Sequence, residues 1–67
     1  MEIIPVNSAS ISHIGYDSST QKMKITFKPN RTYDYCNVPQ NVFDAFLKAS
    51  SIGTFYNEEI KDNYDCW

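Results

Sequence analysis

The stretch that decides the fold reads Lys22-Met23-Lys24-Ile25-Thr26-Phe27-Lys28, with apolar and polar residues in strict alternation. Successive side chains of a β-strand point to opposite faces of a sheet, so this pattern predicts a strand. Met23, Ile25 and Phe27 share its apolar face, and the lysines lie on the other. The strand is therefore expected to have one face against a core and one face toward solvent.

The segments on either side of this stretch predict two more strands. Residues 10–16 are rich in β-branched and aromatic residues and end at the turn-forming run Asp17-Ser18-Ser19-Thr20. Residues 31–37 follow a second turn at Pro29-Asn30 and carry aromatic residues on one face. Together the three segments predict an antiparallel sheet whose neighbouring strands are joined by short turns.

The length of the second turn decides which face of the third strand is buried. A two-residue or four-residue loop would set Asp34 beside Ile25 in the core, where an unpaired carboxylate is costly. A three-residue loop instead places Tyr33 and Tyr35 on the apolar face. We favour the three-residue loop, although Arg31 stands where such loops prefer glycine.

After Val38 the apolar residues recur with the period of a helix. One helical stripe carries Val42, Phe43, Phe46, Leu47 and Ser50. Pro39 suits a first turn, so a helix is predicted over residues 39–49, and Ser51 suits the N-cap of a short second helical segment. The predicted class is α+β: a three-stranded antiparallel sheet in β-β-β-α-α order, covered on one face by the first helix.

Size, composition and charge predict one small domain over residues 1–67. The chain is 42% hydrophobic and 15% aromatic, although a domain of this size buries only about 60% of its unfolded surface. Its net charge of −2 argues against tight binding of duplex DNA, because such binders are usually basic. The charge is polarised, since residues 22–31 hold four basic residues and no acid, whereas residues 55–67 hold four acids and one lysine.

The two cysteines, Cys36 and Cys66, form neither a C-x-x-C pair nor a metal-ligand spacing. Because Cys66 lies in a C-terminal segment expected to be mobile, we predict two reduced thiols. The start of the chain is too short and acidic for a signal peptide, and no apolar run is long enough to cross a bilayer. The predicted location is the cytoplasm.

Several short motifs, each weak alone, follow one another in the order Val6-x-Ser8-x-x-Ile11, Ile14-Gly15-Tyr16-Asp17, Tyr33-x-Tyr35, Val38-Pro39 and Ser51-x-Gly53-x-Phe55-Tyr56-Asn57-x-x-Ile60, with Tyr64 after them. In this order and spacing the chain resembles the KTSC domain from about residue 6 to residue 64. The resemblance implies a module found at the C-terminus of some lysyl-tRNA synthetases and alone in bacterial and phage proteins. RNA binding has been proposed for the family. The acidic end of this chain departs from the basic end of many members, which argues against a phosphate contact there.

Groups for catalysis or metal binding are few. A Cys36 thiol nucleophile beside His13, the only histidine, would need the first and third strands to be neighbours, with Asp34 or Asp17 to orient the ring. We favour a surface histidine and an inert thiol, and hence no enzyme activity. The acids of the tail are Glu58, Glu59, Asp62 and Asp65. They lack the spacing and central glycine of a calcium loop, so no metal or cofactor is predicted.

The best candidate for a ligand site is the junction between the two helices, residues 50–54. A helix start exposes free N–H groups and glycine permits close approach, so Ser51 and Gly53 are predicted to meet a phosphate. Asn57 and Tyr56 would lie one turn further on. Simple helix capping by Ser51 is the structural alternative.

Residues outside this junction add to the candidate site. Tyr33 and Tyr35 would stack bases if they lay on an open sheet face, with Lys24 holding a phosphate nearby. The structural alternative packs both rings beneath the first helix. The sequence leaves open whether Ser8 and Ser10 lie on the rim of the same site.

Two classes of function remain. The first is a non-catalytic module that binds RNA or a small nucleotide, such as a cyclic one. The negative net charge favours the small nucleotide. A phage protein that sequesters a nucleotide signal would be an example. The second is a protein-interaction module or homo-oligomer that joins the basic hairpin, residues 22–31, to the acidic tail, residues 55–67. Co-purified nucleotide would favour the first class, and a clean multimer the second.

Overall fold

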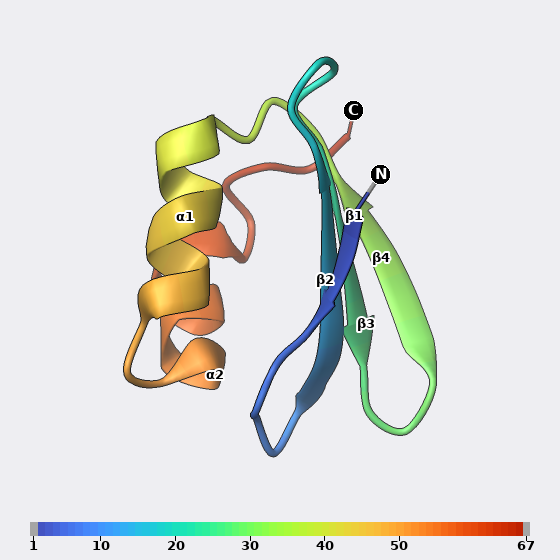
Figure 1. The fold of residues 1–67 in the computed structure, drawn as a ribbon, viewed down its shortest axis with the longest axis vertical. Coiled ribbons are helices and arrows are strands. Elements are labelled where there is room, and N and C mark those ends of the chain that lie inside the picture. The colour runs from blue at the N-terminus through green and yellow to red at the C-terminus, as the bar shows by residue number, and fades with distance from the viewer. Residues whose placement is uncertain (1, 67) are drawn as a thin grey trace.

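A four-stranded antiparallel sheet and a layer of short helices make up the fold (Figure 1). The computed structural model describes residues 2–66. Its elements are β1 Glu2–Pro5, β2 Ile11–Asp17, β3 Lys22–Phe27, β4 Arg31–Tyr35, α1 Gln40–Lys48, α2 Ile52–Phe55 and the π-helical turn η1 Tyr56–Ile60. The strands lie in the order β1-β2-β3-β4, and the helices cover one face of the sheet.

The sheet has four strands where the sequence predicts three, so the expected β-β-β-α-α order is wrong in its strand count. The added strand, β1, pairs antiparallel with β2 from Glu2 opposite Tyr16 to Pro5 opposite His13. It is only four residues long and ends in proline, a residue that strands tolerate at a sheet edge. The α+β class and the covering of one face by helices are as predicted.

A bulge in β2 explains why its apolar residues do not alternate. The pairing with β3 shifts between Ile11 and His13, so Ser12 is the extra residue. The bulge turns Ile11 and Ile14, which are three positions apart, toward the same face, and both are fully buried. The strand thus contributes to the core along its whole length.

The register between β3 and β4 confirms the three-residue turn. Phe27 pairs with Arg31, Ile25 with Tyr33, and Met23 with Tyr35. Residues 28–30 therefore make the connection, and the tyrosines share the face of the buried β3 residues. Asp34 lies on the opposite, open face, beside Lys24.

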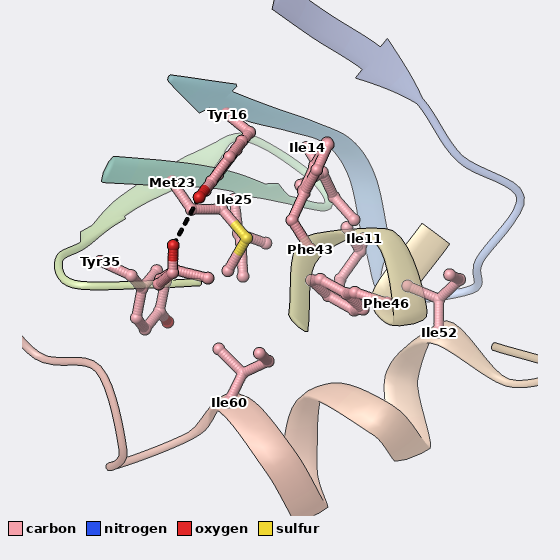
Figure 2. Close-up of a cluster of buried hydrophobic side chains, with 11 residues drawn as sticks. Ile11, Ile14, Tyr16, Met23, Ile25, Tyr35, Phe43, Phe46, Ile52 and Ile60 are labelled. Carbon is pink, nitrogen blue, oxygen red and sulfur yellow. Dashed lines mark hydrogen bonds between the residues drawn. The ribbon is translucent and has the colours of Figure 1, made fainter. Parts of the chain in front are cut away.

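The core lies between the sheet and the helices (Figure 2). Its buried residues are Ile11, Ile14, Tyr16, Met23, Ile25, Tyr35, Val38, Phe43, Phe46, Ile52 and Ile60. Helix α1 lies within one residue of the predicted bounds at each end, with Pro39 at its N-cap. Phe46 is fully buried, and its ring stacks on Phe55 with 5.3 Å between centroids. The Tyr16 hydroxyl donates to the Val38 carbonyl and ties the start of α1 to the sheet.

The C-terminal segment is joined to the sheet by a disulfide, so the prediction of two reduced thiols is wrong. Cys36 and Cys66 are bonded, with their Cα atoms 4.8 Å apart and a sequence separation of 30. The Cys36 N–H also donates to the Tyr64 carbonyl at 2.8 Å, which aligns the tail with the end of β4. The segment expected to be mobile is held at the sheet, and that contact brings the two sulfurs together.

None of the helices within residues 2–66 is long and apolar enough to cross a membrane. Across the same residues, no three histidine, cysteine, aspartate or glutamate side chains gather into a metal-binding group. His13 lies on the open face, where its Nδ1 is 2.7 Å from the Ser12 hydroxyl oxygen. With the Cys36 sulfur in a disulfide, this structure contains no thiol for His13 to activate.

Candidate ligand-binding site

A polar hollow of about 360 Å³ lies between the β1–β2 loop and the start of α2. Its lining residues are Asn7, Ser8, Ala9, Ser10, Ser50, Ser51, Ile52, Gly53, Thr54 and Asn57. The hollow therefore brings together Ser51, Gly53 and Asn57, all predicted from the sequence, and adds the two serines that precede β2. Segments at least 40 positions apart in the sequence meet at this site.

Two of the serines in the hollow have structural roles. The Ser51 Oγ accepts from the Thr54 N–H at 3.3 Å and donates to the Thr54 hydroxyl at 2.9 Å, which confirms Ser51 as an N-cap. The Ser8 Oγ accepts from the N–H groups of Ser10 and Ile11 at 3.2 and 3.3 Å. Both hydroxyls hold the backbone that forms the walls, so they support the hollow more than they face a ligand.

The remaining polar groups of the hollow are open. Within residues 2–66, the side chains of Ser10 and Asn57 make no intramolecular hydrogen bond. A Cβ added at Gly53 would lie 3.4 Å from the Ser10 Oγ, so a larger side chain there would occupy the hollow. The absence of a side chain at Gly53 keeps the space between the two walls open.

Lys28 fixes a positive charge behind the loop that forms one wall. Its Nζ donates to the Ser8 carbonyl at 2.7 Å, and its backbone N–H donates to the Ser10 carbonyl at 2.9 Å. The lysine is exposed, so its charge is solvated but held in place by these bonds. Its charge therefore lies on the loop that lines the hollow, where it would attract an anion without lining the hollow itself.

The three predicted aromatic residues lie outside the hollow: Tyr33 and Tyr35 on the core face of β4, and Tyr56 on η1. Tyr35 is only 5% exposed, and its hydroxyl is 2.8 Å from that of Tyr56. The Phe27 ring makes edge contacts with Tyr56 and Tyr33, with 5.0 and 5.6 Å between centroids. Tyr33 is 48% exposed. Tyr35 is thus a core residue that cannot stack a base, Tyr56 is its half-buried partner, and Tyr33 alone offers a ring to the surface.

Lys24 lies on the opposite face of the sheet from the helices and from the three tyrosines. Its Nζ is 3.9 Å from an Asp34 carboxylate oxygen, and both side chains are at least half exposed. Lys22, Cys36 and Cys66 complete a second depression around this pair, of about 410 Å³. Lys24 was predicted to hold a phosphate near Tyr33 and Tyr35, and the structure places it on the other face of the sheet from both rings.

Comparison with known proteins gives the family. Residues 7–64 match the KTSC domain. The chain belongs to the KTSC domain family. The crystal structure of a KTSC domain protein from Yersinia pestis has a TM-score of 0.90 at 35% identity, over 94% of this chain and 89% of that one. A protein from Tsukamurella paurometabola is 40% identical over 60 residues, 90% of both chains. An uncharacterized protein from Stutzerimonas stutzeri is 32% identical over 68 residues, 100% of this chain and 96% of its own.

The last motif of this KTSC domain, residues 51–60, has some residues in the core and others at the hollow. Phe55 and Ile60 pack in or against the core, and Tyr56 bonds Tyr35. Gly53 and Asn57 face the hollow. The sequence does not place Lys28 near the helix junction, because that position depends on the end of β3 lying beside the β1–β2 loop. Only the pairing of β2 with β3 establishes this arrangement.

The buried tyrosines of this KTSC domain predict a loss of stability at alkaline pH. Burial raises the pKa of Tyr35, and the hydrogen bond to Tyr56 raises it further. Burial also raises the pKa of Tyr16 above its ordinary value. A folded-state pKa above the unfolded value means that the unfolded chain loses its protons first, so the stabilisation is complete below about pH 10 and falls as the pH rises further. Denaturant melts across this range, read beside phenolate absorbance, should show stability falling as the phenols ionise; constant stability would contradict the prediction.

Proposed function

We propose that this KTSC domain is a non-catalytic module that binds a phosphate-bearing ligand, RNA or a small nucleotide, in the hollow between the β1–β2 loop and the α2 start. The observation that carries the proposal is the meeting of two distant segments around open polar groups, those of Ser10 and Asn57. Gly53 leaves the space between them free, and the anchored Lys28 supplies a positive charge. Hydroxyl, amide and ammonium groups of this kind suit a phosphate.

The size and charge of the molecule favour a small nucleotide over a long RNA. A hollow of about 360 Å³ falls within the range of small-molecule sites. A net charge of −2 disfavours a ligand that carries many phosphates. Holding a nucleotide signal away from its receptor, as a phage protein would do in its host, needs tight binding and no catalysis.

We propose the cytoplasm as the location, since a nucleotide ligand would be met there. The Cys36–Cys66 disulfide is the observation against it. Stable disulfides are typical of oxidising compartments and rare in the cytosol.

The test is calorimetric titration of the protein against a panel of short RNAs and cyclic nucleotides. Replacing Gly53 with glutamate should weaken binding by about tenfold or more, because the new side chain fills the hollow and adds a charge of the same sign as the phosphate. The matched control is Ser18→Glu, which adds the same charge at an exposed position in the β2–β3 turn. The control should bind as the wild type does.

Lys24→Glu separates the two ligand classes in the same titrations. An RNA that crosses the open face would lose one phosphate contact, which lowers the salt slope of binding by about one unit. A small nucleotide held in the hollow should be unaffected. The phosphate-site proposal fails if the wild type binds nothing in the panel, or if Gly53→Glu binds as tightly as Ser18→Glu.

A further inference from the structure

Within residues 2–66, no strand pairs with the outer edge of β4. β4 ends the sheet order, and it forms the right-hand margin of the sheet in Figure 1. The Cys36 N–H points away from β3, since it donates to the Tyr64 carbonyl. In an antiparallel strand, alternate residues direct their N–H and C=O groups to the same side. Thr32 and Asp34 therefore direct theirs outward, between the turn at residues 28–30 and the tail.

Charged side chains shield this edge only at Arg31 and Asp34. Edge strands are commonly shielded by proline, bulges or inward charges, and β1 at the other margin carries Pro5. β4 has neither proline nor bulge within Arg31–Tyr35. Tyr33 lies midway between the two outward residues and is 48% exposed, which makes it one of two large exposed hydrophobic residues within residues 2–66. The other is Ile3, on β1.

We propose that this edge pairs with the same edge of a second copy, antiparallel and about a two-fold axis at Tyr33. In this register Thr32 lies opposite the partner's Asp34, and Asp34 lies opposite the partner's Thr32. The outward N–H and C=O groups of both residues are then satisfied in both copies. The two sheets would join into one continuous sheet of eight strands, since each copy contributes four.

The free groups of the edge select this register over its neighbours. A shift of two residues toward the tail would pair Thr32 with the partner's Cys36, whose N–H is already bonded to Tyr64. A shift of two residues the other way would pair Asp34 with the partner's Asn30, which lies in the turn. Only the register centred on Tyr33 uses the two outward residues and no others.

Side chains and charge also suit a second copy as the occupant. The Tyr33 rings of the two copies meet directly across the axis, which removes exposed aromatic surface. Arg31 comes opposite the partner's Tyr35, at the end of the strand where the tail with Asp65 is fixed through Tyr64 and the disulfide. Arg31 of each copy thus lies at the end of the partner's β4, where Asp65 stands between two anchored residues. A two-fold axis forms both contacts at once.

Sedimentation of the full chain tests the pairing over concentrations of about 10 µM to 1 mM, because a small interface associates weakly. The apparent mass should rise from 7.8 kDa toward twice that value, and added salt should weaken the rise. Tyr33→Lys places two like charges across the axis and should leave a monomer at all concentrations. Thr32→Pro removes an outward N–H that β3 does not use, and it should do the same.

The matched control is Ile3→Lys, which makes the same kind of change at the exposed residue of β1 and should leave the dimer intact. Amide exchange gives a second measurement, since the Thr32 and Asp34 N–H groups should exchange more slowly as the wild-type concentration rises. A monomeric wild type throughout the range overturns the proposal. The proposal is also overturned if Ile3→Lys abolishes the dimer while Thr32→Pro and Tyr33→Lys leave it intact. Dimer formation and nucleotide titration are separate measurements, because no residue of the hollow lies on β4.

Discussion

Replacing Phe46 with alanine is expected to lower the free energy of unfolding by about 3–5 kcal/mol. Phe46 is fully buried in the centre of the core and stacks on Phe55 across the two helical segments. Truncation removes the burial of the ring and leaves a cavity that neighbouring side chains fill only in part. A domain of this length has a total stability of only about 5 kcal/mol, so much of the population should unfold.

Urea denaturation followed by circular dichroism measures this loss. The matched control is Asn41→Ala on the exposed side of the same helix, which should change stability by no more than about 0.5 kcal/mol. An unchanged midpoint for Phe46→Ala would mean that the helix does not present this residue to the sheet.

The central hairpin could be predicted from the sequence because two independent constraints agree there. The alternation of Met23, Ile25 and Phe27 fixes the buried face of β3, and the cost of burying Asp34 fixes the length of the next turn. Both constraints act over a few residues. Helix α1, which follows, could be predicted equally well, because its apolar residues recur with the period of a helix.

The parts that could not be predicted depend on contacts between distant segments. β1 is a strand only because β2 offers an edge to Glu2–Pro5, and its own four residues carry no alternating pattern. The bulge at Ser12 interrupts the alternation of buried and exposed residues in β2, and it arises from a register shift in the pairing of β2 with β3. The exposure of Tyr33 beside the buried Tyr35 depends on how far the helical layer reaches over the sheet.

The candidate site divides in the same way. The N-cap of Ser51 follows from local chemistry and was predicted. Gly53 was predicted to leave space for a ligand, and its position beside the Ser10 Oγ depends on the fold. The serines of the β1–β2 loop and the anchored Lys28 join them only through the fold of the sheet. Tyr56 is adjacent to Asn57 in the sequence but turns toward Tyr35 instead of the hollow, a direction that the helical period alone does not reveal.

Reducing the Cys36–Cys66 disulfide is expected to lower the free energy of unfolding by about 3–4 kcal/mol, from the entropy of opening a loop of this length in the unfolded chain. The bond spans 30 positions, almost half of the chain, and encloses both helical segments and η1. Without it, the tail keeps the hydrogen bond from Cys36 to Tyr64 and the packing of the Tyr64 ring, which is only partly buried. The effect should therefore be among the largest that any single change produces in this chain.

Thiol titration of the unfolded wild-type protein without reductant should find no free thiol, and after reduction it should find two. Urea melts with and without a dithiol reductant then measure the change in stability. The control is the double variant Cys36→Ser, Cys66→Ser, whose stability should match that of the reduced wild type and should not respond to reductant. Two free thiols in the untreated protein, or equal midpoints with and without reductant, would contradict the bond and return the tail to the mobile segment that its sequence suggests.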